Sequence, residues 1–182
     1  YRQTDPEFIR LLDAIRTGDY TDETLNAINS RVDSIFNIDE NESYITLTGT
    51  NERANMINSR KLANLPGRPG CYNASFEGNF DKTKTLPADA ELYLKRGARV
   101  IITRNDPKGE YVNGSLGVVG GLNEKDILVK LDEGRTVSVE RCNWEKVEYK
   151  LDIEKNKVVS EVKGVMKQFP VRLAWALTIH KG

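Results

Sequence analysis

The sequence predicts an α/β domain into which a small antiparallel β-barrel is inserted. A strand, a polar turn and a helix follow one another within residues 44–65, which is the βα unit of an open parallel sheet. From about Leu92 to Val162 the pattern changes to short alternating segments separated by turn signals, which indicates a small antiparallel barrel. An apolar run after Gly164 restores the α/β pattern. The predicted segments are 1–91 and 164–182 for the α/β domain and 92–163 for the inserted barrel.

The composition is that of a globular protein and argues against a membrane-spanning, secreted or disulfide-rich one. The chain has 182 residues, of which 38% are hydrophobic and 30% charged, so it can bury a core. Lysine plus arginine equals aspartate plus glutamate at 27 each, so net charge favours neither nucleic acid nor membrane and leaves only a local basic stripe open. Apolar runs of transmembrane length and a signal-peptide pattern are both lacking. The isolated Cys71 and Cys142 predict no disulfide framework, and an intracellular, cytoplasmic protein without a membrane partner is expected.

Two amphipathic helices open the chain. Asp5 is a cap for the first helix, which Gly18 ends, and Thr21 begins the second. With so short a link, they predict a helical hairpin. The residues predicted to share a face are Phe8, Leu11, Leu12 and Ile15 in the first helix, and Leu25, Ile28, Asn29 and Val32 in the second.

The predicted βα unit begins with a buried strand at Tyr44–Thr48 and continues into a helix at Glu52–Leu65. Its turn, Gly49–Asn51, lies at the carboxyl end of the strand, where open α/β sheets bind ligands. The alternative, which the pattern favours for either residue by itself, is that Thr50 or Asn51 simply caps the helix. The residues predicted to face inward from the helix are Ala54, Ile57 and Leu62.

The rest of the chain is predicted to be mostly strands. Residues 66–87 are rich in glycine, proline and asparagine, which favours an irregular connection or a short hairpin. The run Val171–Ile179 predicts a buried strand or helix that places the polar residues after it at the edge of the core. Because the chain stops abruptly after this run, we expect it to be a piece of a longer protein. The predicted barrel strands are Arg99–Thr103, Ser115–Gly120, Ile127–Leu131, Thr136–Val139 and Val147–Leu151.

The sequence contains no phosphate-binding P-loop, because G-x-x-x-x-G-K-[ST] occurs nowhere in the chain. The segment Ile127–Glu133 superficially resembles an apolar strand that ends in Mg²⁺-binding acids. Gly134 and the strand that follows favour a simple hairpin turn at this point. On these residues alone, no nucleotide or metal site is predicted.

The last residues carry three donors close together. Thr178, His180 and Lys181 offer a hydroxyl, an imidazole and an ammonium group, which suits contact with a backbone phosphate. His180 lacks an obvious nucleophile partner, so general-base catalysis is a poor interpretation. The alternative is an ordinary strand end with solvated polar residues.

A second polar stretch enters the predicted barrel. Basic residues with aromatic neighbours suit single-stranded nucleic acid, and they suit the solvated rim of a small barrel equally well. The sequence leaves both readings open. The residues concerned are Lys95, Arg96, Arg99 and Arg104, with Tyr93 and Tyr111 nearby.

Four blocks in order resemble a superfamily 1 DNA helicase of the RecD/Pif type. They are YRQ-x-DPEFIRLL, LTGTNERANMINSRKL, LKRGARVIITRND with YVNGSLGVV, and QFPVRLAWALTIHKG. The resemblance implies movement from 5′ to 3′ on single-stranded DNA, driven by ATP with Mg²⁺ between two RecA-like domains. The first such domain, with the P-loop, would be missing from this chain. The chain would be the second, incomplete RecA-like domain, interrupted by a barrel of Src-homology type.

The resemblance also implies roles for single residues. Arg2 stands where the family's arginine reaches the γ-phosphate, a catalytic contact in the intact parent. Gly182 occupies a place where the family usually has serine. No residue is assigned to a metal. The residues implied to contact the DNA backbone are Thr48, Thr50 and Asn51 in the second block and Thr178, His180 and Lys181 in the last.

Two functions follow as expectations. The first is a part of an ATP-dependent DNA helicase, inactive by itself because the P-loop domain is absent, with single-stranded DNA and the missing RecA-like domain as partners. If bacterial, the parent would be associated with the nucleoid. The alternative is a non-enzymatic nucleic-acid-binding or scaffold domain.

Overall fold

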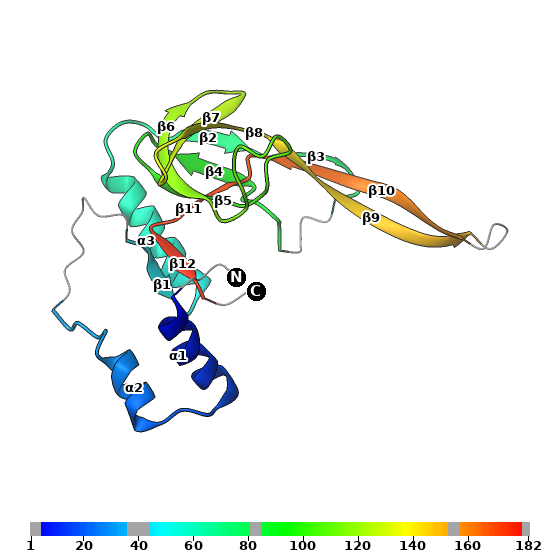
Figure 1. Ribbon diagram of the computed structural model, residues 1–182. Helices are drawn as coiled ribbons and strands as arrows, with labels where there is room; N and C mark the ends of the chain where they lie inside the picture. Colours follow the sequence, from blue (N-terminus) through cyan, green and yellow to red (C-terminus); the bar gives the residue numbers. More distant parts are fainter. Residues whose placement is uncertain (1–4, 36–43, 81–84, 153–156, 180–182) are drawn as a thin grey trace. The chain divides into compact units, whose positions relative to one another are not determined.

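The computed structural model describes residues 5–35, 44–80, 85–152 and 157–179 (Figure 1). The chain divides into two compact units, Tyr1–Ser43 and Tyr44–Gly182, and each is described by itself. Within the described ranges, no helix combines the length and the apolar character that crossing a bilayer requires.

The first unit is the predicted helical hairpin. Helix α1 spans Pro6–Thr17 and helix α2 spans Asp22–Asn29. The Asp5 carboxylate caps α1 by accepting hydrogen bonds from two first-turn N–H groups, at 3.0 and 3.2 Å. Gly18 ends α1 with a φ of 77°, a left-handed conformation that glycine adopts without strain. Thr21 caps α2, so the predicted starts of both helices are confirmed.

The predicted faces of this hairpin are confirmed only in part. Leu11 is buried, whereas Phe8, Leu12 and Ile15 are exposed. Val32 is exposed and lies beyond the end of α2, so its predicted place on the helix is wrong. The helix ends early because Asn29 and Ser30 are poor helix formers that favour terminal positions.

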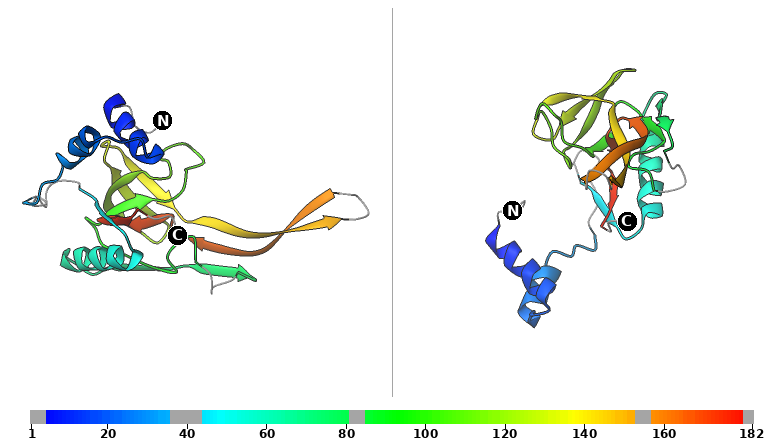
Figure 2. Two further views of the ribbon diagram at one scale, coloured as in Figure 1. Left: turned by 90° about the horizontal axis from the view of Figure 1, so that it is seen from below. Right: turned by 90° about the vertical axis from the view of Figure 1, so that its right-hand side faces the viewer.

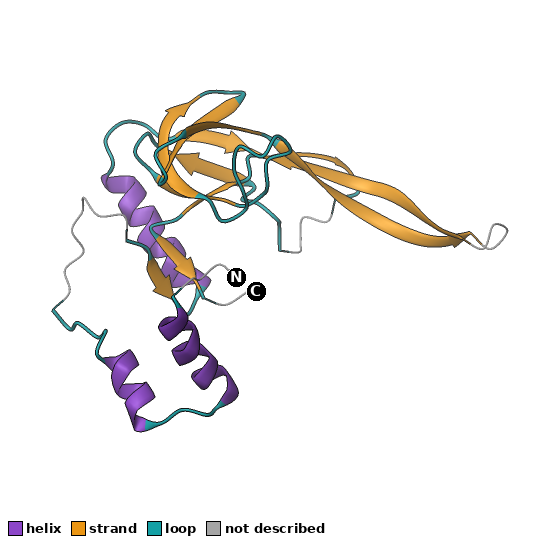
Figure 3. Cartoon of the chain, in the orientation of Figure 1, coloured by secondary structure: helices purple, strands orange, loops and turns teal. Residues whose placement is uncertain are grey.

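The second unit begins with the predicted strand, turn and helix. Strand β1, Thr46–Thr48, pairs in parallel with strand β12, Ala176–Thr178. Helix α3, Asn51–Asn64, follows β1 and contacts both strands (Figure 3). The expectation of a buried strand is wrong, because Leu47 is 66% exposed and only Thr48 is buried. In the described part of the chain β12 alone pairs with β1, so the other edge of β1 has no partner strand there.

Helix α3 turns a partly polar face inward. Thr50 caps it, since the Thr50 Oγ1 accepts a hydrogen bond from the Arg53 N–H at 3.3 Å. Ala54 is buried as predicted, and the two other predicted inward residues are half-buried. The second buried residue of α3 is polar: Asn58 is 7% exposed and was not predicted.

An antiparallel sheet of five strands, in the order β11-β5-β6-β7-β8, holds the main core. Four of the five predicted barrel strands lie in this sheet, with small shifts at their ends, and the fifth, Val147–Leu151, lies in another strand that pairs outside it. The predicted hairpin turn at Asp132–Gly134 joins β7 to β8 and is also confirmed. The bounds are Arg99–Ile102 for β5, Leu116–Leu122 for β6, Asp126–Leu131 for β7, Thr136–Glu140 for β8 and Val171–Leu173 for β11.

This sheet is open among the described residues. Strands β11 and β8 form its two edges and do not pair with each other, so a closed barrel is not observed there. The fold is therefore mixed α/β with antiparallel sheets. The domain limits predicted from the sequence stay predictions, and strand β10 runs through the predicted limit at residues 163 and 164.

A long hairpin and two short pairings make up the rest of the strands described. Strand β9, Cys142–Asp152, and strand β10, Lys157–Gln168, pair along their length and extend away from the five-stranded sheet (Figure 2). Strand β2, Gly70–Asn73, pairs with β4, Glu91–Leu94. Strand β3, Ser75–Gly78, pairs with β10. The short hairpin predicted as one option for residues 66–87 is therefore wrong, because β2 and β3 pair with distant strands and not with each other.

A buried glutamine holds these pairings together. Gln168 has 0% exposure, and its Nε2 donates to the carbonyl oxygens of Tyr72 at 2.8 Å and Asp89 at 3.0 Å. Its Oε1 accepts from the Phe169 N–H and from the Arg141 guanidinium. Because both ends of the amide are satisfied, the side chain fixes the backbone before β4 at little cost in desolvation.

The apolar run near the end of the chain is divided between two sheets. Its first part is β11, antiparallel to β5, and its second part is β12, parallel to β1. Ala174 and Trp175 make the link between them. The run is therefore two short strands, in place of the single strand or helix expected, and it ties the five-stranded sheet to the βα unit.

Candidate nucleic-acid interface

Two threonines meet at one edge of the parallel pair. Thr48 ends β1, Thr178 ends β12, and the two are direct register partners. Parallel strands present their carboxyl ends at the same edge, and the turn into α3 begins there as well. Residues that are 130 positions apart in the sequence are thereby brought to one place.

Hydrogen bonds order this edge. The Thr178 Oγ1 donates to the Asn51 Oδ1 at 2.9 Å, and the Thr48 Oγ1 donates to the carbonyl oxygen of Thr50 at 3.0 Å. We call Thr48, Thr50, Asn51 and Thr178 the Thr–Asn cluster. Asn51 is exposed, and its Nδ2 group is left to donate outward because its oxygen already accepts from Thr178.

Four of the seven residues singled out from the sequence are thus together in the Thr–Asn cluster. Arg2, His180 and Lys181 lie outside the described residues. The structure shows where these side chains lie, and contact of the cluster with DNA stays a prediction.

Asn58 locks the cluster in place and was missed from the sequence. Its Oδ1 accepts from the Ala176 N–H at 2.8 Å, and its Nδ2 donates to the carbonyl oxygens of Ala176 at 2.9 Å and Leu173 at 3.4 Å. One amide from α3 therefore bridges the end of β11 and the start of β12. The available signal was its spacing, since Asn58 follows the inward Ala54 by four residues and shares its face.

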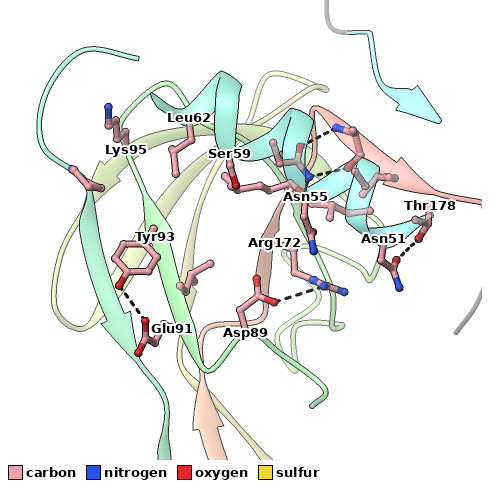
Figure 4. A pocket seen from close by; sticks show the side chains of 18 of the residues that line it. Asn51, Asn55, Ser59, Leu62, Asp89, Glu91, Tyr93, Lys95, Arg172 and Thr178 are labelled. Atoms are coloured by element: carbon pink, nitrogen blue, oxygen red, sulfur yellow. Dashed lines mark hydrogen bonds and ion pairs between the residues drawn. The ribbon is translucent and has the colours of Figure 1, made fainter. Parts of the chain in front are cut away.

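A cavity of about 900 Å³ adjoins the cluster and is lined by α3 on one side and by β4, β11 and the segment before β4 on the other (Figure 4). We call it the α3 groove. Asn51 and Thr178 belong to both the cluster and the groove. The polar residues that line its two walls include Asn51, Asn55 and Ser59 on α3, and Asp89, Glu91, Tyr93 and Arg172 opposite.

Lys95 lies at the far end of the groove. It is 8% exposed, and its Nζ donates to the carbonyl oxygens of Leu65 at 2.6 Å and Ala63 at 3.3 Å. These carbonyls lie at the C-terminal end of α3, where a cation is favoured by the helix dipole. Lys95 therefore stabilises the helix end and is not a solvated or phosphate-binding cation in this structure.

The other residues of the basic and aromatic stretch differ in burial and in their partners. Arg99 is buried and forms a two-pronged ion pair with Asp132. Arg104 is exposed, with its guanidinium 5.4 Å from the centre of the Trp144 ring. Tyr111 is buried, so it offers no stacking surface, whereas Tyr93 is 45% exposed and faces the groove. The pairing with Arg99 also gives Asp132 a structural role within the predicted hairpin turn.

Tyr93 keeps its proton over a wide pH range. Its hydroxyl group donates to the Glu91 Oε2 at 3.0 Å, and Cys71 is its cross-strand partner. The side chains of Cys71 and then Glu91 raise the pKa of Tyr93 to about 12. Near neutral pH, the groove therefore presents a neutral phenol ring whose hydroxyl group is bonded to Glu91.

The relatives found by comparison with known proteins agree with one another, since they carry the same name. No family model matches the chain. The chain is 29% identical over 184 residues to the ATP-dependent DNA helicase Pif1 of Bdellovibrio bacteriovorus and 31% identical over 198 residues to that of Xenopus laevis. These matches cover 99% of this chain but 39% and 28% of the two relatives, so the chain spans well under half of their length.

Solved structures agree. Unliganded Pif1 from Bacteroides superimposes over 99% of this chain and 41% of that one, with a TM-score of 0.88 and 35% identity. The same protein bound to single-stranded DNA gives a TM-score of 0.70 at 36% identity. The fold and these relatives together define the class as DNA helicases. Within that class, the chain belongs to the Pif1-type helicases.

Proposed function

We propose that this chain supplies single-stranded DNA backbone contacts to an ATP-dependent helicase that moves from 5′ to 3′. The observation that carries the proposal is the Thr–Asn cluster at the carboxyl edge of β1 and β12. It is supported by the likeness to Pif1 structures, one of which is bound to single-stranded DNA.

The chemistry of the cluster suits a phosphodiester backbone. Hydroxyl and amide groups donate hydrogen bonds to phosphate oxygens without reading the base. The start of α3, which Thr50 caps, adds the positive end of a helix dipole beside Asn51. His180 and Lys181 would add two further donors from the end of the chain. Such contacts bind any sequence, as a motor that steps along DNA requires.

Nucleotide chemistry is proposed to depend on residues outside this sequence. The 182 residues contain no P-loop, and Bacteroides Pif1 has been crystallised with ADP-AlF4. In the full-length protein a first RecA-like domain would bind ATP and Mg²⁺, and Arg2 would reach the γ-phosphate.

The same proposal covers the finer architecture. Residues 1–91 and 164–182 would form the second RecA-like domain, and residues 92–163 a Src-homology barrel that guides the strand. ATP would close the cleft between the RecA-like domains and hydrolysis would reopen it. Stepping requires that each domain hold the strand with a different affinity in the two states. A protein that acts on DNA would lie inside the cell, and in a bacterium it would be associated with the nucleoid.

We expect the chain to bind single-stranded DNA weakly, with an affinity that falls as salt rises. For each phosphate contacted, the logarithm of the binding constant should fall by about 0.7 per logarithmic unit of salt. Asn51→Ala should weaken binding roughly tenfold, because a hydrogen bond to a charged group is lost. Fluorescence anisotropy with a labelled strand measures both effects.

Asn64→Ala is the matched control for this experiment. Asn64 is exposed at the opposite end of α3, so its loss should leave affinity within about twofold. Binding that does not respond to salt, or equal losses in the two variants, would contradict the proposed backbone contact.

In the full-length helicase, Arg2→Ala should lower the rate of ATP hydrolysis by about 1,000-fold while DNA binding persists. The reason is the loss of a positive charge that stabilises the transferred phosphoryl group. Arg10→Ala, an exposed arginine of α1, is the control and should keep the wild-type rate. A variant at Arg2 with full DNA-stimulated hydrolysis would remove the proposed role. A full-length protein without any ATPase activity would favour the non-enzymatic alternative.

A further inference from the structure

The α3 groove is continuous with the Thr–Asn cluster but differs from it in chemistry. Asn51 and Thr178 stand at the shared mouth. On the α3 wall Asn51, Asn55 and Ser59 follow one another at intervals of four residues, so they form a polar stripe along one face (Figure 4). Within the described part of the chain, the side chains of Asn55 and Ser59 make no hydrogen bond, and both are exposed. They are free to bind a ligand.

The opposite wall is set by the alternation of strand β4. Leu92 and Leu94 point into the core, with 2% and 0% exposure, so Glu91 and Tyr93 face the groove. Gln168 fixes the backbone at Asp89, immediately before β4. Both walls of the groove are therefore held by buried contacts.

The charges in the groove disfavour a phosphate inside it. Arg172 is already paired with Asp89 at 3.5 Å, and Glu91 adds a second carboxylate. Lys95 is occupied by the carbonyl groups at the end of α3. A polyanion would meet two carboxylates and one paired cation, whereas a neutral polar ring would meet amides, hydroxyls and carboxylates that can form hydrogen bonds with it.

We propose that the α3 groove accepts an unpaired nucleobase of the strand whose backbone lies at the Thr–Asn cluster. Tyr93 offers a ring face for stacking. Asn55 can pair with a base edge, and the carboxylates of Asp89 and Glu91 can accept hydrogen bonds from an exocyclic amino group. Adenine, cytosine and guanine carry such a group, and thymine does not. This inference rests on the proposed contact of the cluster with single-stranded DNA.

The test compares two strands with equal numbers of phosphates. One is about 12 nucleotides of alternating adenine and cytosine, and the other is an abasic strand of the same length. We expect the chain to bind the strand with bases roughly tenfold more tightly, as base stacking predicts. Tyr93→Ala should remove most of that difference and leave affinity for the abasic strand unchanged. Tyr149→Ala, at an exposed tyrosine of the β9–β10 hairpin, is the matched control and should bind both strands like the wild type.

The outcomes separate this inference from the function on which it rests. Wild-type protein that binds neither strand contradicts the proposed function itself. Equal binding of both strands, or a Tyr93→Ala variant that loses affinity for both alike, overturns the nucleobase site while the backbone contact stands. Asn55→Leu provides a second variant on an exposed helix position, and it too should weaken only the binding that depends on bases. If Asn55→Leu binds both strands as the wild type does, the α3 wall is not part of such a site.

Discussion

Replacement of Asn58 by alanine is expected to lower the free energy of unfolding by about 3 kcal/mol. The amide of Asn58 makes three hydrogen bonds in a buried position, two of them to the backbone of Ala176. Alanine would leave the N–H and the carbonyl of Ala176 without these partners, and each unsatisfied buried group costs about 1–3 kcal/mol. Urea denaturation followed by circular dichroism gives the difference.

Asn55→Ala is the matched control, because Asn55 lies on the same helix and is exposed. It should change stability by less than about 0.5 kcal/mol. Asn58→Ala should also weaken binding of single-stranded DNA, since Ala176 begins the strand that carries Thr178. Equal stability of the two variants would show that the bridge from α3 to β12 is not what holds this edge.

Local signals explain why the start of the chain was predictable. Asp5, Gly18 and Thr21 act on the residues beside them, through side-chain caps and a left-handed turn. The same holds for the strands and the tight turn of the five-stranded sheet, whose alternation is visible within a few residues. These features need no knowledge of distant parts of the chain.

Pairing between strands that are distant in the sequence explains most of the wrong predictions of secondary structure. The composition of residues 66–87 suggested irregular structure, yet β2 and β3 form because β4 and β10 supply their partners. The run Val171–Ile179 is uniformly apolar, so its sequence does not indicate that Ala174 and Trp175 divide it between two sheets. Strand formation of this kind depends on tertiary context more than on local preference.

The burial of several polar residues was not predicted, for a related reason. Asn58, Lys95 and Arg99 look like surface residues in a sequence, but each is buried with partners that come from other elements. The Thr–Asn cluster was predictable as two separate blocks through their resemblance to helicase motifs. Its assembly depends on the parallel register of β1 and β12, and the α3 groove depends on the placement of α3 opposite β4 and β11. Neither can be derived from spacing alone.

Gly117→Ala is expected to destabilise the five-stranded sheet by about 3 kcal/mol. A Cβ atom at Gly117 would lie 2.5 Å from the carbonyl oxygen of Lys130 and 2.7 Å from the Cγ1 of Val129. Both atoms belong to the neighbouring strand β7, whose backbone cannot move aside without lengthening its hydrogen bonds to β6. Differential scanning calorimetry would register the loss as a lower Tm.

Gly120→Ala in the same strand isolates this effect from the general consequence of replacing glycine. The nearest atom to a Cβ at Gly120 is the carbonyl oxygen of Leu128 at 3.7 Å, an ordinary contact. Alanine there restricts the unfolded chain and should raise stability by about 0.5 kcal/mol. The two variants share one strand and one chemical change, and they differ in the space beside each residue and in that Gly120 lies at the register shift of β6. Destabilisation of similar size in both would mean that strand β6 needs glycine for its backbone conformation and not for its close approach to β7.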